Sequence, residues 1–418
     1  MTAPGTDREG GFLRGVGALA AATILSNALL FALSLIAARW LVPEEYGVVA
    51  AMLAIVLMLS IPGFALQVAM AREIAAVPPG CAGAVVRRRT RQSAVAGAVM
   101  GAIALALAPV AGDLLQLPTV WPYALTVVAF APLMVLSVLR GTMQGRRDYT
   151  DLGANLVVEA TGRLVCALAA LGAGAGATGV TAAPLAGIIV AGVSAVPAVR
   201  EAWRSDGDLT IPRLPPDILP TLVHFGGFTL LVSADLVIAK AAFTPVVAGE
   251  YAAAAFVGKV LLLLPVAVAL VLVPEVSARR RRGAPTLGLL GQGQALALAG
   301  ALPVIIACGV APGVVAAVTV GPGYEAAESL FLPYSIAAAL FAAVNIQALY
   351  ALTVGAMRVV WTCLAVAIVQ VPALALVATG TGGVGPDDER VGLILVMLSA
   401  STIALGATAR RVVSAGRV

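Results

Sequence analysis

Apolar residues in this sequence gather in long runs that are separated by short polar links. A helix that crosses a bilayer needs about 20 mostly apolar residues, and about twelve windows of the chain meet this requirement. The pattern therefore predicts an all-α polytopic membrane protein with about twelve transmembrane helices. The windows span residues 16–38, 47–70, 93–112, 121–140, 152–173, 179–200, 219–242, 248–272, 287–309, 326–352, 359–379 and 391–409.

The composition excludes water as the main solvent of this chain. Hydrophobic residues make up 61% of it and charged residues only 11%, whereas a soluble domain has about 25% charged residues. The mean hydropathy is +1.01. The net charge of +5 is better explained by basic loops that face anionic membrane lipids than by nucleic acid, so we expect lipids and no nucleic acid as partners.

The basic residues indicate which ends of the spans face the cytoplasm. With the N-terminus inside, most of the 26 basic residues fall in inside links or in the two termini, as the positive-inside rule requires. We therefore predict that both termini are cytoplasmic. The inside links hold Arg72, Arg87, Arg88, Arg89, Arg91, Arg140, Arg146, Arg147, Arg200, Arg204, Arg213, Arg279, Arg280, Arg281, Arg282 and Arg358.

The longest inside link divides the predicted spans six and six. It reads EAWRSDGDLTIPRLPPDI and is polar and proline-rich, as a linker is. The two halves also echo each other in the pairs Glu45-Tyr46 and Glu250-Tyr251, each in the link after the first span of its half. We therefore predict two six-helix bundles, at 1–205 and 219–418, joined by a cytoplasmic linker at 206–218. A duplication of six spans relates them by a pseudo-twofold axis along the membrane normal.

Charged residues inside predicted spans are expensive and mark either a functional site or a structural pair. Glu159 and Arg163 are four residues apart and share one helix face, so they can pair. Asp235 and Lys259 lie on consecutive antiparallel spans and can also meet. The sequence leaves both roles open for each pair. Asn27 could line a cavity or bond a neighbouring helix.

Motifs for cofactor chemistry are missing from the sequence. Gly258-Lys259 is followed by Val260, so no nucleotide-binding loop forms there. The four cysteines lie far apart, and the single histidine makes no cluster with them. We expect no cofactor, no metal, no catalytic residue and no enzymatic activity. A membrane glycan polymerase or ligase would need a large outside loop, and every outside link is short.

Several segments resemble, in the same order, those of the polysaccharide (O-antigen type) flippase family of the multidrug/oligosaccharidyl-lipid/polysaccharide exporter superfamily. The first hairpin reads SNALLFALSLIAARWLVPEEYGVVAAMLAIV. The turn after the fourth span reads LRGTMQGRRDY, and the second-half hairpin begins SADLVIAKAAFTPVVAGEYAAAAFVGK. A lipid II flippase is a close relative but would be expected to have fourteen spans. A multidrug and toxin extrusion antiporter has the same architecture but needs an acidic cavity.

The resemblance implies a transporter of the bacterial inner (plasma) membrane that works by alternating access. It implies export of a lipid-linked oligosaccharide, typically on undecaprenyl pyrophosphate, with a proton or sodium gradient as the candidate driving force. The anionic headgroup needs a hydrated cavity with positive charge, for which Arg163 and Lys259 are the candidates and Arg39 assists near the outer mouth. The predicted cavity residues are Asn27, Arg39, Glu159, Arg163, Asp235 and Lys259.

Overall fold

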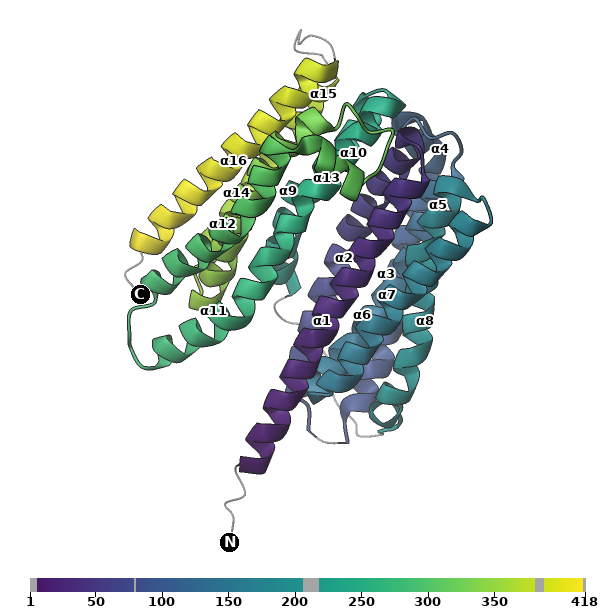
Figure 1. Cartoon of the computed structure of the whole chain (residues 1–418). Helices are drawn as coiled ribbons and strands as arrows, with labels where there is room; N and C mark the ends of the chain where they lie inside the picture. Colours follow the sequence, from purple (N-terminus) through teal and green to yellow (C-terminus); the bar gives the residue numbers. More distant parts are fainter. Residues whose placement is uncertain (1–5, 79, 206–217, 380–386, 416–418) are drawn as a thin grey trace. The chain divides into compact units, whose positions relative to one another are not determined.

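The computed structural model describes residues 6–78, 80–205, 218–379 and 387–415, and all regular structure in these ranges is helical (Figure 1). The first half contains α1 (Thr6–Trp40), α2 (Pro43–Ala76), α3 (Ala82–Ala106), α4 (Ala108–Leu114), α5 (Trp121–Val128), α6 (Phe130–Arg146), α7 (Tyr149–Gly172) and α8 (Gly176–Arg204). The second half contains α9 (Ile218–Ala242), α10 (Pro245–Lys259), the 3-10 helix η1 (Val260–Leu263), α11 (Leu264–Arg281), α12 (Leu287–Val310), α13 (Pro312–Val318), α14 (Glu328–Val354), α15 (Met357–Ala378) and α16 (Asp387–Ala415).

The predicted membrane spans are present as helices. In the described ranges, 11 helices are long and apolar enough to cross a bilayer, or 12 if the bent pair α3 and α4 is one span. This confirms an all-α, multi-pass membrane protein. The prediction of one continuous helix at 93–112 was wrong. The helix is interrupted at Leu107, and α4 is bent by 54° from α3. Pro109, at the start of α4, lacks the backbone N–H that a continuous helix would use.

Large apolar side chains on the helix surfaces are consistent with a lipid solvent. Val310, Val369 and Val193 are 81%, 70% and 69% exposed. In water, such a surface would drive aggregation, whereas acyl chains solvate it at no cost. Several helices also continue past the apolar windows, so that many of the arginines assigned to inside links lie on helix ends, as Arg146 does on α6.

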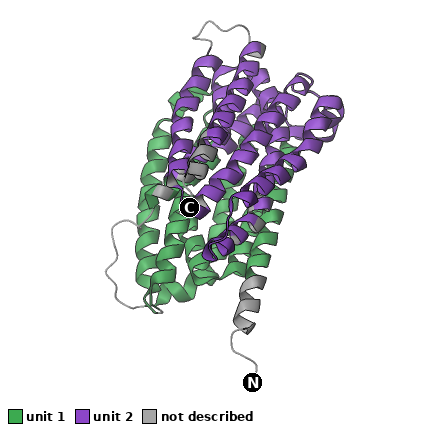
Figure 2. Ribbon diagram, turned by 90° about the vertical axis from the view of Figure 1, so that its left-hand side faces the viewer, with its two compact units in different colours: residues 1–37, 55–222 green, residues 38–54, 223–418 purple. Residues whose placement is uncertain are grey.

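The described chain forms two compact units, shown in two colours in Figure 2. Unit 1 comprises residues 1–37 and 55–222, and unit 2 comprises residues 38–54 and 223–418. The predicted domain boundaries at 205 and 219 stay a prediction. The linker predicted at 206–218 lies, apart from its last residue, outside the described residues.

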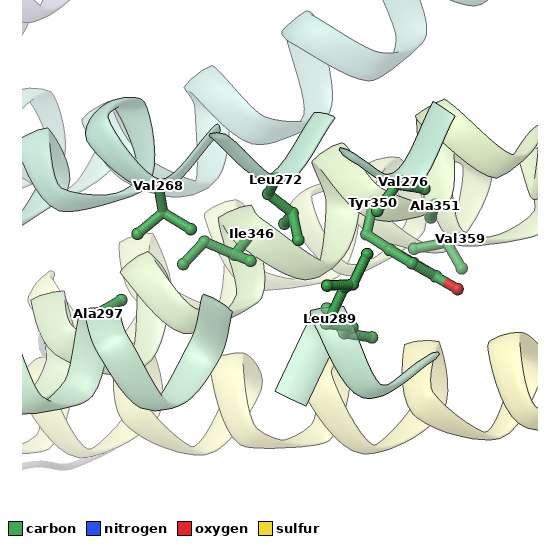
Figure 3. Close-up of a cluster of buried hydrophobic side chains, with 10 residues drawn as sticks. Val268, Leu272, Val276, Leu289, Ala297, Ile346, Tyr350, Ala351 and Val359 are labelled. Carbon is green, nitrogen blue, oxygen red and sulfur yellow. The ribbon is translucent and has the colours of Figure 1, made fainter. Parts of the chain in front are cut away.

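Unit 1 has its apolar core where α2, α3 and α6 meet. Met70 of α2, Val86 of α3 and Val138 of α6 are fully buried there. In unit 2, α11, α12 and α14 pack around Ile346 and Tyr350, as Figure 3 shows. These cores hold the helices that carry the charged residues in fixed positions.

The two turns that echo each other in sequence contact one another inside unit 2. A Cβ on Gly47 would lie 3.1 Å from the Gly249 nitrogen, and a Cβ on Gly249 would lie 2.0 Å from the Pro43 carbonyl oxygen. Tyr46 packs edge-on against Tyr324 with ring centroids 6.1 Å apart, and the Tyr324 hydroxyl donates to the Leu41 carbonyl. Residues 38–54 are therefore anchored in unit 2.

A second repeat appears in the order of the helices. The third span of each half, α3 or α12, is followed by a seven-residue helix with proline at its start, α4 or α13. The Arg39 guanidinium donates to the carbonyl oxygens of Ala317, Val318 and Thr319 at the end of α13. It thereby satisfies carbonyls that a helix C-terminus leaves without partners.

Candidate functional site

A buried charge cluster lies on α6 and α7 in unit 1. Glu159 accepts from Arg163 one turn further along α7, which confirms the predicted pair. Its other carboxylate oxygen lies 2.6 Å from an Arg140 nitrogen on α6. The three side chains are between 10% and 14% exposed. One carboxylate therefore bridges two guanidinium groups away from bulk water.

Asn155 positions Arg140 within this cluster. Its carboxamide oxygen accepts from Arg140 Nε at 2.7 Å. Its nitrogen donates to the Ala191 carbonyl at 2.7 Å and to the Ser194 hydroxyl at 2.9 Å, both on α8. Because all of its hydrogen-bonding groups are used, Asn155 ties α6, α7 and α8 together around the arginine.

The cluster is positive, because two guanidinium groups face one carboxylate. The Arg163 Nε is buried and finds no acceptor within the described structure. Buried guanidinium donors without partners are costly in a medium of low dielectric. The site is therefore suited to accept a further anionic group with several oxygen acceptors.

Arg140 is a member of this cluster that the sequence did not predict. It was assigned to the cytoplasmic link after the fourth span, which the hydropathy window ended at residue 140. The helix instead continues to Arg146, so Arg140 lies more than one turn inside it, and its side chain is 10% exposed. The sequence contains one indication of this position. The five residues GTMQG separate Arg140 from Arg146, which is more than one helical turn, so Arg140 can be buried while Arg146 lies at the interface.

Gly187 on α8 provides the space for Arg163. A Cβ at this position would lie 2.4 Å from Arg163 Cγ and 2.7 Å from the Glu159 carbonyl oxygen. Any larger residue would therefore push the arginine away from its partner. Beside the cluster, an open surface pocket of about 370 Å³ lies between α7 and α8, and it is lined by Asp151, Ala154, Asn155, Val158, Ser194, Pro197 and Ala198.

A second charge cluster is centred on Asp235 in unit 2. Lys259 Nζ donates to Asp235 Oδ1 at 3.2 Å, which confirms the pairing predicted for consecutive spans. The hydroxyls of Tyr251 and Tyr334 both donate to Asp235 Oδ2, at 3.1 and 2.5 Å. The two tyrosine rings pack edge to face, with centroids 5.6 Å apart. The sequence indicated Tyr251 only as part of the repeated Glu-Tyr pair and did not place either tyrosine beside Asp235, because nothing local relates them to residue 235.

The space beside Asp235 is small. A cavity of about 10 Å³, bordered by Asp235, Lys259 and Tyr334, has room for roughly one water molecule. The Asp235 side chain is 2% exposed and the Lys259 side chain is 22% exposed. The carboxylate is therefore enclosed by its three donors, whereas the Lys259 side chain is partly exposed.

The other two predicted cavity residues, Asn27 and Arg39, lie outside both clusters. Arg39 is held at the end of α13 in unit 2 by the carbonyls described above. Asn27 is half-buried on α1. Ala22 of α1 lies against Gly153 of α7. Asn27 is five residues beyond Ala22, and Glu159 is six residues beyond Gly153. As the first and fifth spans, α1 and α7 run in the same direction, so Asn27 and Glu159 lie at about the same depth at a rise of 1.5 Å per residue.

Comparison with known proteins identifies the fold. No known family model matches the chain, and no curated protein sequence matches it. Among solved structures, an inward-facing multidrug resistance MATE family transporter of the MOP superfamily is 12% identical and superimposes with a TM-score of 0.73, over 94% of this chain and 98% of that one. This chain has the fold of the MOP superfamily transporters.

Two further MOP-type structures extend the likeness. The lipid II flippase MurJ, in an inward closed conformation, is 10% identical with a TM-score of 0.69, over 96% of this chain and 87% of that one. A MOP superfamily transporter from Pyrococcus furiosus is 13% identical with a TM-score of 0.55, over 97% and 96% of the two chains. At these identities the likeness shows the fold alone, so the substrate must be inferred from the charge clusters.

Proposed function

We propose that this protein flips a lipid-linked oligosaccharide from the inner to the outer leaflet of the bacterial inner membrane by alternating access, with both termini in the cytoplasm. The observation that carries the proposal is the excess positive charge of the buried unit 1 cluster, in which Arg140 and Arg163 share Glu159. An undecaprenyl pyrophosphate headgroup supplies the missing negative charge, while its lipid chain stays in the bilayer.

The chemistry of the cluster matches such a headgroup. Guanidinium groups bind phosphate oxygens through two parallel hydrogen bonds, and a phosphate offers the acceptors that the buried Arg163 Nε lacks. Lys259 is the second proposed contact, because its side chain is partly exposed while that of Asp235 is enclosed. Asn27 and Arg39 complete the proposed cavity set, with Arg39 near the outer end. A proton or sodium gradient is the proposed driving force.

A multidrug and toxin extrusion antiporter is the second candidate, because a MATE transporter is among the solved structures that share this fold. Binding of a cationic drug requires an accessible carboxylate. Glu159 is bridged by two arginines, and Asp235 is bound by a lysine and two tyrosines. Neither acid offers an uncompensated negative charge, so the charge clusters support the flippase.

The test is deletion of the gene, followed by complementation. Deletion should trap lipid-linked glycan on the inner leaflet and remove a surface polysaccharide, and the wild-type gene should restore it. Arg163→Gln should fail to restore it, whereas Arg146→Gln, a change at an exposed ion pair, should succeed. Normal surface glycan together with increased dye sensitivity in the deletion strain would replace the flippase by the antiporter.

A further inference from the structure

The span that carries Lys259 changes its helical geometry directly after this residue. Lys259 is the last residue of α10, and Val260–Leu263 form the 3-10 helix η1 before α11 begins at Leu264. Pro265 follows at the start of α11. A 3-10 stretch in the middle of a helix has poorer hydrogen-bond geometry than the α-helical turns around it and often marks a hinge.

Both sides of this break are anchored in unit 2. On the α10 side, Gly258 lies so close to Tyr334 of α14 that a Cβ on the glycine would be 2.4 Å from the tyrosine ring. On the α11 side, Val268 and Leu272 pack into the core around Ile346 (Figure 3). The 3-10 segment therefore connects two fixed segments, and a change of angle between them would be concentrated there.

The ion pair beside the break is built to separate. The Lys259 side chain is 22% exposed and the Asp235 side chain is 2% exposed, so Lys259 is the member that an incoming anion meets first. When Lys259 leaves, Asp235 keeps the hydroxyl donors of Tyr251 and Tyr334. These two hydrogen bonds lower the cost of leaving a buried carboxylate without its cation.

We propose that the Asp235–Lys259 pair is a latch on the 3-10 break of this span, which opens when a phosphate group of the substrate takes Lys259 from Asp235. The inference rests on the proposed function for the identity of the anion, but the latch itself depends only on the pair and the break. Loss of the pair frees the last turn of α10 from Asp235 of α9, directly before the 3-10 break, and departure of the headgroup lets the pair form again.

Amide hydrogen exchange of the purified full-length protein tests the latch. Asp235→Asn weakens the hold on Lys259 with no ligand present, and should speed exchange of residues 256–264 about tenfold while α12 is unchanged. Arg279→Gln, which removes an exposed cation from the same span, is the matched control and should leave exchange as in the wild type. Lys259→Gln removes the other partner and should speed exchange of the same residues. It takes the place of Asp235→Asn if the Asp235→Asn protein does not fold.

Added inorganic pyrophosphate should speed exchange of the same residues in the wild type and have no further effect on Lys259→Gln. Unchanged exchange in a folded Asp235→Asn or Lys259→Gln protein would overturn the latch and make the pair a static tie. Exchange could instead be faster in these variants while pyrophosphate has no effect on the wild type. That result would overturn the proposal that a phosphate group opens the latch. Failure of the proposed function is read separately, from normal surface polysaccharide in the deletion strain.

Discussion

Substitution of Arg140 tests whether the unit 1 cluster is a single charged unit. Arg140→Gln removes the contact of 2.6 Å to Glu159 and the hydrogen bond of 2.7 Å to Asn155. Glu159 keeps Arg163 as its partner, so no buried carboxylate is left alone. The expected loss is that of hydrogen bonds to charged groups, about 1.5–3 kcal/mol of unfolding free energy.

Glu159→Gln should be more damaging than Arg140→Gln. It leaves two buried guanidinium groups without a counter-charge, which costs about 3–5 kcal/mol. Arg146→Gln is the matched control on the same helix, because Arg146 is 29% exposed and its partners Glu201 and Asp148 are 84% and 31% exposed. Solvent screens ion pairs as exposed as these, so they contribute little to stability.

Thermal unfolding of the purified variants in detergent measures this order. Membrane proteins of this size often unfold irreversibly, so midpoints should be compared at one heating rate. The expected ranking, from the lowest midpoint, is Glu159→Gln, Arg140→Gln, then Arg146→Gln near the wild type. An Arg140→Gln midpoint equal to that of Arg146→Gln would refute the buried three-residue cluster. So would a Glu159→Gln protein more stable than Arg140→Gln.

Three further predictions follow from the described contacts and the proposed topology. Gly249→Ala should lower stability by about 1–3 kcal/mol, because its Cβ would meet the Pro43 carbonyl; Gly291→Ala on α12, where nothing lies within 4 Å, should be neutral or stabilising by about 0.5–1 kcal/mol. Unfolding midpoints compare the two. Arg39→Ala should speed amide exchange at the end of α13, whose carbonyls it binds, and unchanged exchange would contradict that role. A reporter fused after Arg282 should report the cytoplasm, and a periplasmic signal would reverse the topology.

The sequence alone determined the helical membrane architecture of this protein. Hydrocarbon leaves backbone groups no partner other than their own helix, so a long apolar run specifies a span without any knowledge of its neighbours. The Glu159–Arg163 pair also followed from local geometry, because residues four apart share a helix face. The Asp235–Lys259 pair followed from the adjacency of consecutive spans.

Only the tertiary structure decided which residues join these pairs. Arg140, Tyr251 and Tyr334 reach the clusters from other turns or helices, and residues 38–54 pack with unit 2 although they precede most of unit 1 in the chain. Lipid chains are as apolar as the helix surfaces, so hydropathy does not specify which helices meet. Close approach at small residues and hydrogen bonds between buried polar groups make that choice, and both exist only once the helices are packed.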